Sequence, residues 1–324
     1  MTRMTWTHKI LPTLALLCTS LLAQAAYPDK PITLVVPYPP GGATDIIARK
    51  LAGPLGQRLG QTVVVENKAG AGTAIGATAV ARSAPDGHTL LISSNTTFTV
   101  NPALKKTLPY DPQQDFESIG LIGSSPLVLI AHPGVAANNV KELLELAKRT
   151  PQGLSFGSFG VGTSAHLAGE MFKVMTGANL VHVAYRGSAP AMTDLIGGQI
   201  PLSFDTTVAA QPQIAAGKVK AIAVTTRLRS AQMPQVPTVA EAGFPDYEMV
   251  PWITVVARRG LPADVRTKLT QALKDSVNDS AVKADLQKTG VDVLHQPGAE
   301  YDTRVAKELP LLRAYVHRAN IPVE

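Results

Sequence analysis

The fold is decided by Pro37-Tyr38-Pro39-Pro40-Gly41-Gly42-Ala43-Thr44-Asp45, a glycine turn between two apolar segments. The preceding run, Ile32–Val36, is typical of a buried strand, and residues 46–51 have the apolar spacing of a helix. A strand that turns through Gly-Gly into a helix leaves several backbone N–H groups unpaired. Because the helix dipole adds positive potential there, the turn predicts a site for a carboxylate or phosphate.

Outward from this turn, apolar strand-like runs alternate with helical patterns over most of the chain. The pattern favours an α/β protein with parallel sheets and helices on both faces. From Pro262 onward the chain is predicted to be mostly helical, with helices at 263–277, 281–289 and 300–319 and a short strand near 291–294. The other predicted strands lie at residues 32–36, 62–66, 89–93, 120–122, 128–131, 154–157, 181–185, 202–205, 221–225 and 254–257.

Two long extended stretches, residues 118–133 and 247–260, are interpreted as crossings between domains. They predict a discontinuous first lobe, residues 26–124 and 252–324, with a second lobe, residues 125–251, inserted into it. The cleft between the lobes is then the expected ligand site. A single large sheet would fit the same periodicity.

The N-terminus, residues 1–25, is predicted to be a secretory signal peptide. It has a basic start, an apolar stretch at residues 10–22 and a small-x-small cleavage site, Ala23-Gln24-Ala25. The apolar stretch is short for a membrane span and contains Pro12, which argues against an uncleaved anchor. We therefore expect export, with cleavage near Ala25.

Cleavage would remove Cys18, the only cysteine of the chain. The mature protein would then have no disulfide, no thiolate nucleophile and no metal–thiolate site. Loss of Arg3 and Lys9 takes the formal charge from +6 to +4. This mild positive charge favours anions but is far below a nucleic-acid footprint, so no nucleic-acid partner is expected.

The first turn has two counterparts further along the chain. Residues 181–196 predict a strand, a turn at Arg186-Gly187-Ser188-Ala189-Pro190, and a helix; residues 157–167 predict the same succession through a glycine turn. Ligands of open α/β sheets bind at the carboxyl ends of the strands, where these turns lie. Together, the three turns could bind an anion from both sides of a cleft.

At these residues the chain resembles the periplasmic solute-binding proteins of tripartite tricarboxylate transporters, also called Bug receptors. The resemblance covers the whole mature chain in order. The matching segments are Tyr27-Pro28-Asp29-Lys30-Pro31-Ile32, residues 37–45, Gly70-Ala71-Gly72 with Gly76, residues 162–170, residues 185–191, and Gly197-Gly198-Gln199-Ile200 leading to Asp205. Pro40 and Ala43 depart from the family pattern, which often has a small flexible residue and a glycine there.

The resemblance implies a type II periplasmic-binding-protein fold, with two α/β lobes joined by a hinge that close over a small carboxylic acid. It implies a periplasmic protein, a monomer, that delivers this acid to membrane transporter subunits. We expect no cofactor, no metal and no catalytic residue. A variant of this function is that the closed form reports the acid to a membrane sensor kinase.

The candidate ligand-binding residues come from the turns and nearby strand ends. Thr44 is expected to cap its helix, and Asp45 to brace the loop rather than touch an anion. Asp205 could accept from a ligand hydroxyl, hold water, brace the hinge or pair with a ligand amine. The candidates are Tyr38, Pro39, Gly41, Gly42, Ala43, Thr44, Asn95, Thr163, Ser164, Tyr185, Gly187, Ser188, Ala189 and Asp205.

Plainer interpretations stand beside these. Gly41-Gly42 could be an ordinary tight turn, and Arg186 could be solvated rather than contact a carboxylate. His166 and Glu170 have metal-ligand spacing, but two ligands do not make a site, so a structural pair is expected. An exported hydrolase is disfavoured because Ser158 lacks the glycine two positions earlier that a nucleophile elbow needs.

Overall fold

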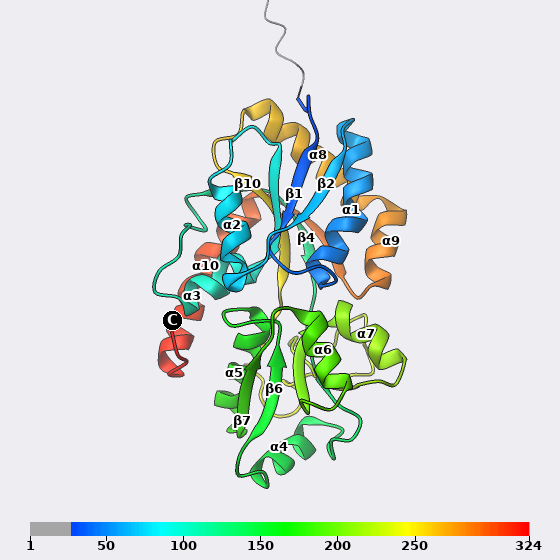
Figure 1. Ribbon diagram of the computed structural model, residues 1–324, viewed down its shortest axis with the longest axis vertical. Helices are drawn as coiled ribbons and strands as arrows, with labels where there is room; N and C mark the ends of the chain where they lie inside the picture. Colours follow the sequence, from blue (N-terminus) through cyan, green and yellow to red (C-terminus); the bar gives the residue numbers. More distant parts are fainter. Residues whose placement is uncertain (1–26, 324) are drawn as a thin grey trace, which may run out of the picture.

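The structure, a computed structural model, describes residues 27–323 and has two α/β lobes. In Figure 1 the six-stranded sheet, order β11-β4-β10-β3-β1-β2, forms the upper lobe, and the five-stranded sheet, order β7-β6-β8-β5-β9, forms the lower lobe. The predicted signal peptide, residues 1–25, lies outside the described residues. Across residues 27–323, no helix combines the length and apolar character needed to cross a membrane.

The elements follow the sequence pattern closely. The strands are β1 (Ile32–Val36), β2 (Val63–Asn67), β3 (Thr89–Ser94), β4 (Phe116–Ser124), β5 (Leu127–Ala131), β6 (Leu154–Ser158), β7 (Leu180–Ala184), β8 (Leu202–Thr206), β9 (Lys220–Val224), β10 (Trp252–Arg258) and β11 (Asp292–Pro297). The helices are α1 (Ala43–Leu59), α2 (Ala74–Ala81), α3 (Asn101–Leu104), α4 (Val140–Lys148), α5 (Ser164–Thr176), α6 (Ser188–Ile196), α7 (Thr207–Ala215), α8 (Ala263–Asn278), α9 (Ser280–Lys288) and α10 (Ala299–Arg318). A single-turn 3-10 helix, η1 (Ala71–Thr73), and a π-helical turn, η2 (Thr96–Val100), complete the set.

The expectation of parallel sheets was wrong, because both sheets are mixed. β1 is parallel to β2 and β3, but β10 is antiparallel to β3 and β4, and β5 is antiparallel to β8 and β9. β5 and β10 carry the chain away from the junction of the lobes, each after a crossing. They therefore run against the strands that end at this junction.

Helices cover both faces of each sheet, as predicted. Leu34 and Val36 of β1 lie in one apolar cluster with residues of α1, α8 and α9, whereas Val35 lies in another with residues of α2 and α10. In the second sheet, Leu129 packs with residues of α5 and Val128 with residues of α6. Successive side chains of each strand thus point to opposite faces of the sheet and pack against different helices.

The chain crosses between the sheets twice. β4 ends at Ser124 and β5 of the other sheet begins at Leu127; the return ends where β10 begins at Trp252. Both crossings fall in the two extended stretches noted in the sequence.

A third connection is made by packing rather than by a crossing. The second half of α10 contributes Leu309 and Val316 to an apolar cluster that spans both lobes. This cluster contains Leu104 of the upper lobe together with Phe172 and Tyr247 of the lower lobe. Figure 1 shows α10 descending along one side of the molecule, from the upper lobe toward the lower.

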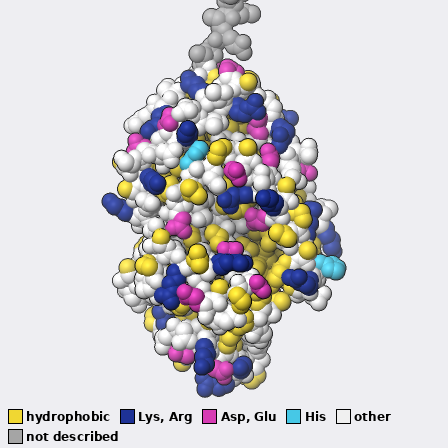
Figure 2. Space-filling model, turned by 180° about the vertical axis from the view of Figure 1, so that it is seen from behind, with side chains coloured by type: hydrophobic (Ala, Val, Ile, Leu, Met, Phe, Trp, Pro, Cys, Tyr) yellow, Lys and Arg dark blue, Asp and Glu magenta, His cyan; other side chains and the backbone are white. Residues whose placement is uncertain are grey.

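The opposite face carries interspersed basic and acidic side chains. Figure 2 shows it hollowed at the waist between the lobes, where hydrophobic side chains gather.

Candidate functional site

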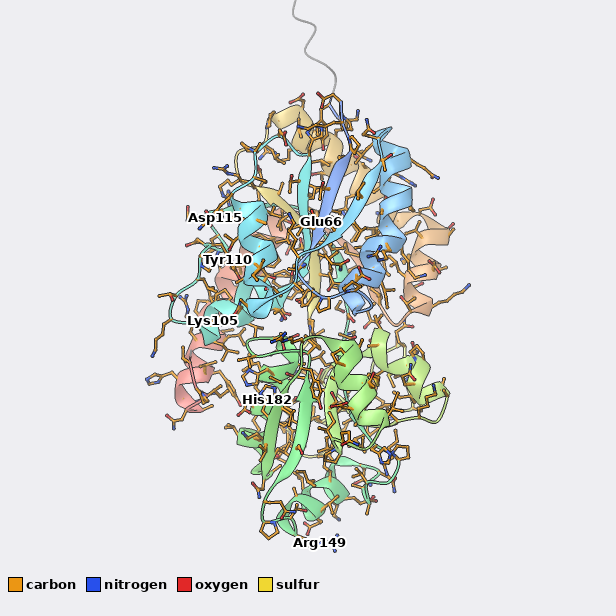
Figure 3. The ribbon with its side chains drawn as sticks, in the orientation of Figure 1. Glu66, Lys105, Tyr110, Asp115, Arg149 and His182 are labelled. Atoms are coloured by element: carbon orange, nitrogen blue, oxygen red, sulfur yellow. The ribbon has the colours of Figure 1, made fainter. Side chains whose placement is uncertain are left out.

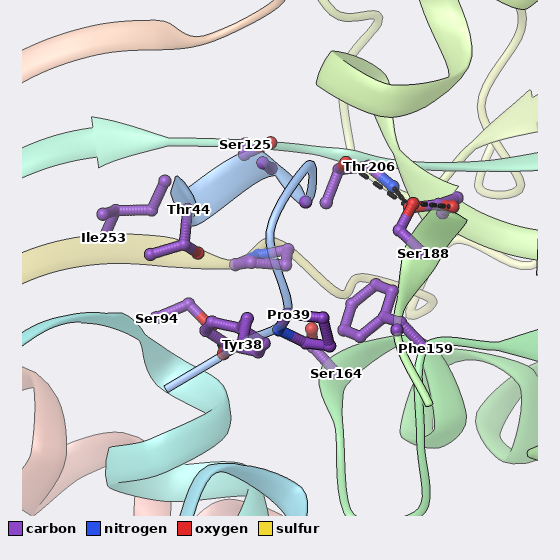
Figure 4. Close-up of a pocket in the computed structure, with 15 residues that line it drawn as sticks. Tyr38, Pro39, Thr44, Ser94, Ser125, Phe159, Ser164, Ser188, Thr206 and Ile253 are labelled. Carbon is purple, nitrogen blue, oxygen red and sulfur yellow. Dashed lines mark hydrogen bonds between the residues drawn. The ribbon is translucent and has the colours of Figure 1, made fainter. Parts of the chain in front are cut away.

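A small cavity of about 40 Å³ lies between the lobes, at the ends of the strands that run toward the junction. We call it the inner cavity (Figure 4). It is lined by Tyr38, Pro39, Gly42, Ala43, Thr44, Ser94, Ser125, Phe159, Ser164, Gly187, Ser188, Asp205, Thr206, Pro251 and Ile253.

Two helix N-termini, one from each lobe, meet at the inner cavity. Gly42 is the N-cap of α1 and Gly187 the N-cap of α6, and both line the cavity. Neither residue has a side chain that could cap its helix, so the first N–H groups of both helices are available to a ligand. Both helix dipoles add positive potential at this point, which suits a carboxylate.

The lobes touch each other around the cavity. Gly187 has φ 121°, and a Cβ atom there would lie 2.9 Å from Cγ of Pro39. On another side, the Ser164 N–H donates to Oγ1 of Thr96 at 3.1 Å, and the two hydroxyl oxygens are 3.3 Å apart. The structure therefore has its lobes in contact across the site.

Aromatic side chains form one wall. The Tyr38 hydroxyl hydrogen-bonds to Ser94 Oγ at 2.8 Å, which holds the ring against the upper lobe. The Phe159 ring from the lower lobe meets it edge to face, with 6.5 Å between ring centroids. This wall gives the cavity an apolar side opposite its polar groups.

Asp45 braces the first turn, as predicted. Its carboxylate accepts from the Gly41 N–H at 2.9 Å, from Asn67 Nδ2 at 2.9 Å and from Arg49, whose Nη2 lies 3.0 Å away. Burial would raise the pKa of Asp45, but the hydrogen bonds from Arg49, Gly41 and Asn67 outweigh burial and hold that pKa below its usual value. The ionised carboxylate thus fixes the loop from behind.

Asp205 lines the cavity itself. Its carboxyl accepts from Ser188 Oγ at 2.5 Å and from the Thr206 N–H at 2.7 Å (Figure 4). Burial raises the pKa of Asp205 to about 6, although these hydrogen bonds oppose the shift. Among the described residues that line the inner cavity, none is Lys, Arg or His.

The structure brings together many of the candidate residues but not all. Tyr38, Pro39, Gly42, Ala43, Thr44, Ser164, Gly187, Ser188 and Asp205 line the inner cavity. Thr163 and Tyr185 line a second cavity of about 490 Å³, on the far side of the aromatic wall. Gly41, Asn95 and Ala189 line neither cavity.

One expectation needs correction. Thr44 does not cap α1, because Gly42 is in extended conformation (φ −77°, ψ 166°) and the helix already begins at Ala43. Asn95 does not line the inner cavity, and its Nδ2 donates to Oε1 of Glu308 on α10 at 3.2 Å, so its role in binding stays a prediction.

Several lining residues were missed by the sequence interpretation. Ser94, Ser125 and Thr206 end or follow strands that point at the junction, so strand-end position was the available signal. Phe159 lies within the glycine turn after β6. Pro251 and Ile253 belong to the return crossing, and no pattern in the sequence marks them as lining residues.

A Ser–His contact in the lower lobe does not form a nucleophile. Ser158 Oγ lies 2.7 Å from Nε2 of His182, whose ring stacks on His166 at 4.2 Å between centroids. Burial lowers the pKa of His182 to about 3, with His166 and Lys173 adding to the shift. Such a weak base cannot activate a serine, and Ser158 is itself fully buried.

The metal-ligand spacing of His166 and Glu170 does not produce a shared site. Glu170 pairs with Lys173 at 2.9 Å, while His166 stacks on His182. Each of the two residues thus has a further partner, and the expected structural pair stays a prediction. Within residues 27–323, no group of three His, Cys, Asp or Glu side chains is arranged to hold a metal ion.

Known proteins are similar to this chain in sequence and in architecture. The sequence profile of the "Tripartite tricarboxylate transporter family receptor" family matches residues 47–319. Protein BugT of Bordetella pertussis is 38% identical over 257 residues, covering 79% of each chain.

Solved structures agree with the sequence comparisons. The periplasmic binding protein BugD has 37% identity and a TM-score of 0.87, over 92% of this chain and 100% of its own. R. palustris Rpa4515, solved with adipate, has 32% identity and a TM-score of 0.88 over the same shares. These relatives are substrate-binding receptors, not enzymes. The chain therefore belongs to the receptor family of the tripartite tricarboxylate transporters.

Proposed function

We propose that this protein is an exported, monomeric receptor that captures a small carboxylic acid and delivers it to the membrane subunits of a tripartite tricarboxylate-type transporter. The observation that carries the proposal is the convergence of two helix N-termini, at Gly42 and Gly187, on one cavity between the lobes. The adipate bound to a relative of the same fold supports a carboxylate ligand.

Capture works by closure of the lobes. The proposed lobes are residues 26–124 with 252–324, and residues 125–251, after removal of residues 1–25 in the periplasm. A carboxylate held by N–H groups of both α1 and α6 has more contacts when the lobes are together, so its differential affinity favours the closed state. The closed form is then what the transporter recognises.

The contacts divide between backbone and hydroxyl groups. We assign the N–H groups around Gly42, Ala43 and Gly187 to the carboxylate, since charge-assisted bonds from backbone amides need no basic side chain. Hydroxyl donors and acceptors of Thr44, Ser164 and Ser188 surround them. Gly41, Asn95 and Ala189 are assigned supporting rather than contacting roles.

The test is a thermal-shift screen of mature protein, refolded to remove ligand carried over from expression, against organic acids and their amides. One acid should raise the melting temperature saturably while its amide does not. Emission of Trp252, the only tryptophan after the signal peptide, is the second readout because it lies at the return crossing. An equal response to acid and amide would contradict carboxylate capture.

A further inference from the structure

A carboxylate outside the inner cavity accepts from three donors that belong to two segments of the upper lobe. Glu308 lies in the middle of α10, and its Oε1 accepts from Asn95 Nδ2 at 3.2 Å and from Thr99 Oγ1 at 2.8 Å. Its Oε2 accepts from Trp252 Nε1 at 2.6 Å. The side chain thus connects the η2 turn, with its N-cap Asn95, to the first residue of β10.

The three donors depend on this carboxylate. Asn95, Thr99 and Trp252 are all buried. Within residues 27–323, Glu308 is the acceptor that the structure provides for Asn95 Nδ2 and for Trp252 Nε1, and neither nitrogen has another. A buried donor that loses its acceptor is destabilising, so Glu308 fixes where η2 and the start of β10 lie.

The η2 turn carries a direct contact between the lobes. Thr96, its first residue, accepts from the Ser164 N–H at 3.1 Å, and its hydroxyl oxygen lies 3.3 Å from Ser164 Oγ. Ser164 is the first residue of α5 and lines the inner cavity. The N-terminus of α5 therefore binds a hydroxyl group of the upper lobe, whereas the N-termini of α1 and α6 meet at the cavity. π-helical turns such as η2 are rare and occur frequently at functional sites.

The same turn is connected to the aromatic wall. The Thr96 N–H donates to Ser94 Oγ at 3.3 Å, and Ser94 Oγ also hydrogen-bonds to the Tyr38 hydroxyl. Further along η2, the hydroxyl of Tyr110, which is labelled in the upper lobe in Figure 3, donates to the Thr97 carbonyl oxygen at 2.6 Å. The position of η2 therefore affects both the wall of the cavity and the contact with α5.

Glu308 also lies behind the return crossing. Trp252, which donates to it, is flanked by Pro251 and Ile253, and both of these residues line the inner cavity. The Trp252 ring stacks on Phe98 of η2, with 5.9 Å between centroids and 9° between planes. One carboxylate thus supports two segments that border the cavity, although Glu308 is not among the lining residues.

We propose that Glu308 is a positioning residue for ligand capture. Its carboxylate holds η2 where Thr96 binds Ser164 of the other lobe, and this contact favours the closed state. The assignment rests on the proposed function, because it takes ligand affinity to be coupled to closure of the lobes. Asn95 then contributes to binding by anchoring η2 to α10.

The experiment is a double-mutant cycle on refolded mature protein. Calorimetric titration measures its affinity for the straight-chain mono- or dicarboxylic acid that wild type binds best. Glu308→Ala should weaken binding about twentyfold, because η2 is released and both contacts of Thr96 with Ser164 are lost. Thr96→Val removes the hydroxyl directly and should cause a similar loss. In the double variant the second substitution should add less than about threefold, since both act through the same contact.

Glu308→Gln is the conservative variant. It keeps the shape of the side chain and one oxygen acceptor, so affinity should fall only about fivefold. Should Glu308→Ala fail to fold, the same cycle with Glu308→Gln and Thr96→Val decides the question.

Glu117→Ala is the matched control. Glu117 lies at the end of β4 far from the crossing, and its carboxylate also has three donors: the Gly260 N–H at 2.9 Å, the Leu261 N–H at 2.7 Å and Arg266 Nη1 at 3.3 Å. Its loss should lower the melting temperature about as much as Glu308→Ala does, and leave acid affinity within about twofold.

Three results would overturn the positioning role while the proposed function stands. They are wild-type affinity in the Glu308 variants, losses that multiply in the double variant, and an equal loss in Glu117→Ala, which would mean that affinity follows overall stability. If wild type binds no acid of the series, the proposed function fails and the positioning role with it.

Discussion

The two turns that meet at the inner cavity have similar backbones, but the pKa values of their aspartates are shifted in opposite directions. Each is a strand, a glycine turn and an uncapped helix, and each is stabilised by an aspartate. Asp45 of the upper lobe has Arg49 beside it and a pKa below its usual value. Asp205 of the lower lobe is buried with hydroxyl and amide donors only, and its pKa is raised to about 6.

The two aspartates therefore have different roles: Asp45 fixes the loop, and the charge of Asp205 acts on the bound ligand. Asp45 accepts from the Gly41 N–H and from Arg49 Nε behind the loop, and the guanidinium of Arg49 balances its charge, so it repels an anion little. Asp205 lines the cavity, so its charge acts directly on whatever binds there. An anionic ligand and an ionised Asp205 repel each other, whereas a neutral Asp205 can donate a hydrogen bond.

Disrupting the contact between the two turns should reduce ligand affinity more than any other change. In Gly187→Ala the new Cβ would lie 2.9 Å from Cγ of Pro39, and the backbone at φ 121° would be strained. We expect acid affinity to fall by about 100-fold or more, because closure is blocked and strain of a few kcal/mol is added. Isothermal titration measures this.

Gly177→Ala is the control for backbone strain alone. Gly177 follows α5 with φ 70°, and a Cβ atom added there would have no atom within 4 Å. It should lose similar thermal stability and keep its affinity within about threefold. Equal loss of affinity in both variants would show that Gly187 does not act through contact with Pro39.

The charge on Asp205 should appear as a pH dependence of binding. Because its pKa is about 6, affinity for a monocarboxylate should fall as pH rises above 6, by up to tenfold per pH unit. Asp205→Asn should flatten this profile between pH 5 and 8. A wild-type profile that is already flat would mean that the ligand supplies a donor to an ionised Asp205.

The same group should affect stability in the opposite sense to a typical surface aspartate. Between pH 3.8 and about 6 the folded protein binds a proton at Asp205 that the unfolded chain has released, so stability falls as pH rises through this window. The full cost above the window is up to about 3 kcal/mol for such a shift. Asp205→Asn should therefore be the more stable protein at pH 7.5 in urea unfolding, and the advantage should vanish near pH 3.5.

Removing the charge of Asp45, which fixes the first turn, should reduce ligand affinity least. Asp45→Asn loses the ion pair with Arg49 while its side-chain oxygen can still accept from Gly41, so affinity should fall only about threefold. Since the pKa of Asp45 is lowered, its contribution to stability is present above the usual carboxyl pKa and is lost as pH falls through the folded value. Arg49→Gln, with Arg49 half exposed, should reproduce part of this loss; no loss in either variant would remove Asp45 from the bracing role.

Strand positions could be predicted because long apolar runs bounded by Gly, Pro and Asn leave little choice. Strand direction could not, since a buried run such as residues 254–257 has the same pattern whichever way it runs. Only the crossings between lobes fix the direction of β5 and β10.

The candidate site was predictable where it depends on local turns and not where it depends on distant partners. Gly42 and Gly187 follow from strand–turn–helix patterns. The contact of Asn95 with Glu308 could not be predicted, because the two residues are 213 positions apart. Glu308 also accepts from Thr99 Oγ1 at 2.8 Å and Trp252 Nε1 at 2.6 Å, a set of contacts that no local pattern shows.

The packing of α10 against the lower lobe has a consequence for how the protein unfolds. Leu309, Val316 and Ile321 share one apolar cluster with Phe172 and Tyr247, although the first turns of the same helix belong to the core of the upper lobe. Two lobes joined only by crossings could melt one after the other, each with its own transition. A helix whose two ends are buried in different cores couples them, because neither core can be exposed without loosening the other. We therefore expect denaturation of this protein to be a single cooperative transition, in which a destabilising change in either lobe lowers the stability of both.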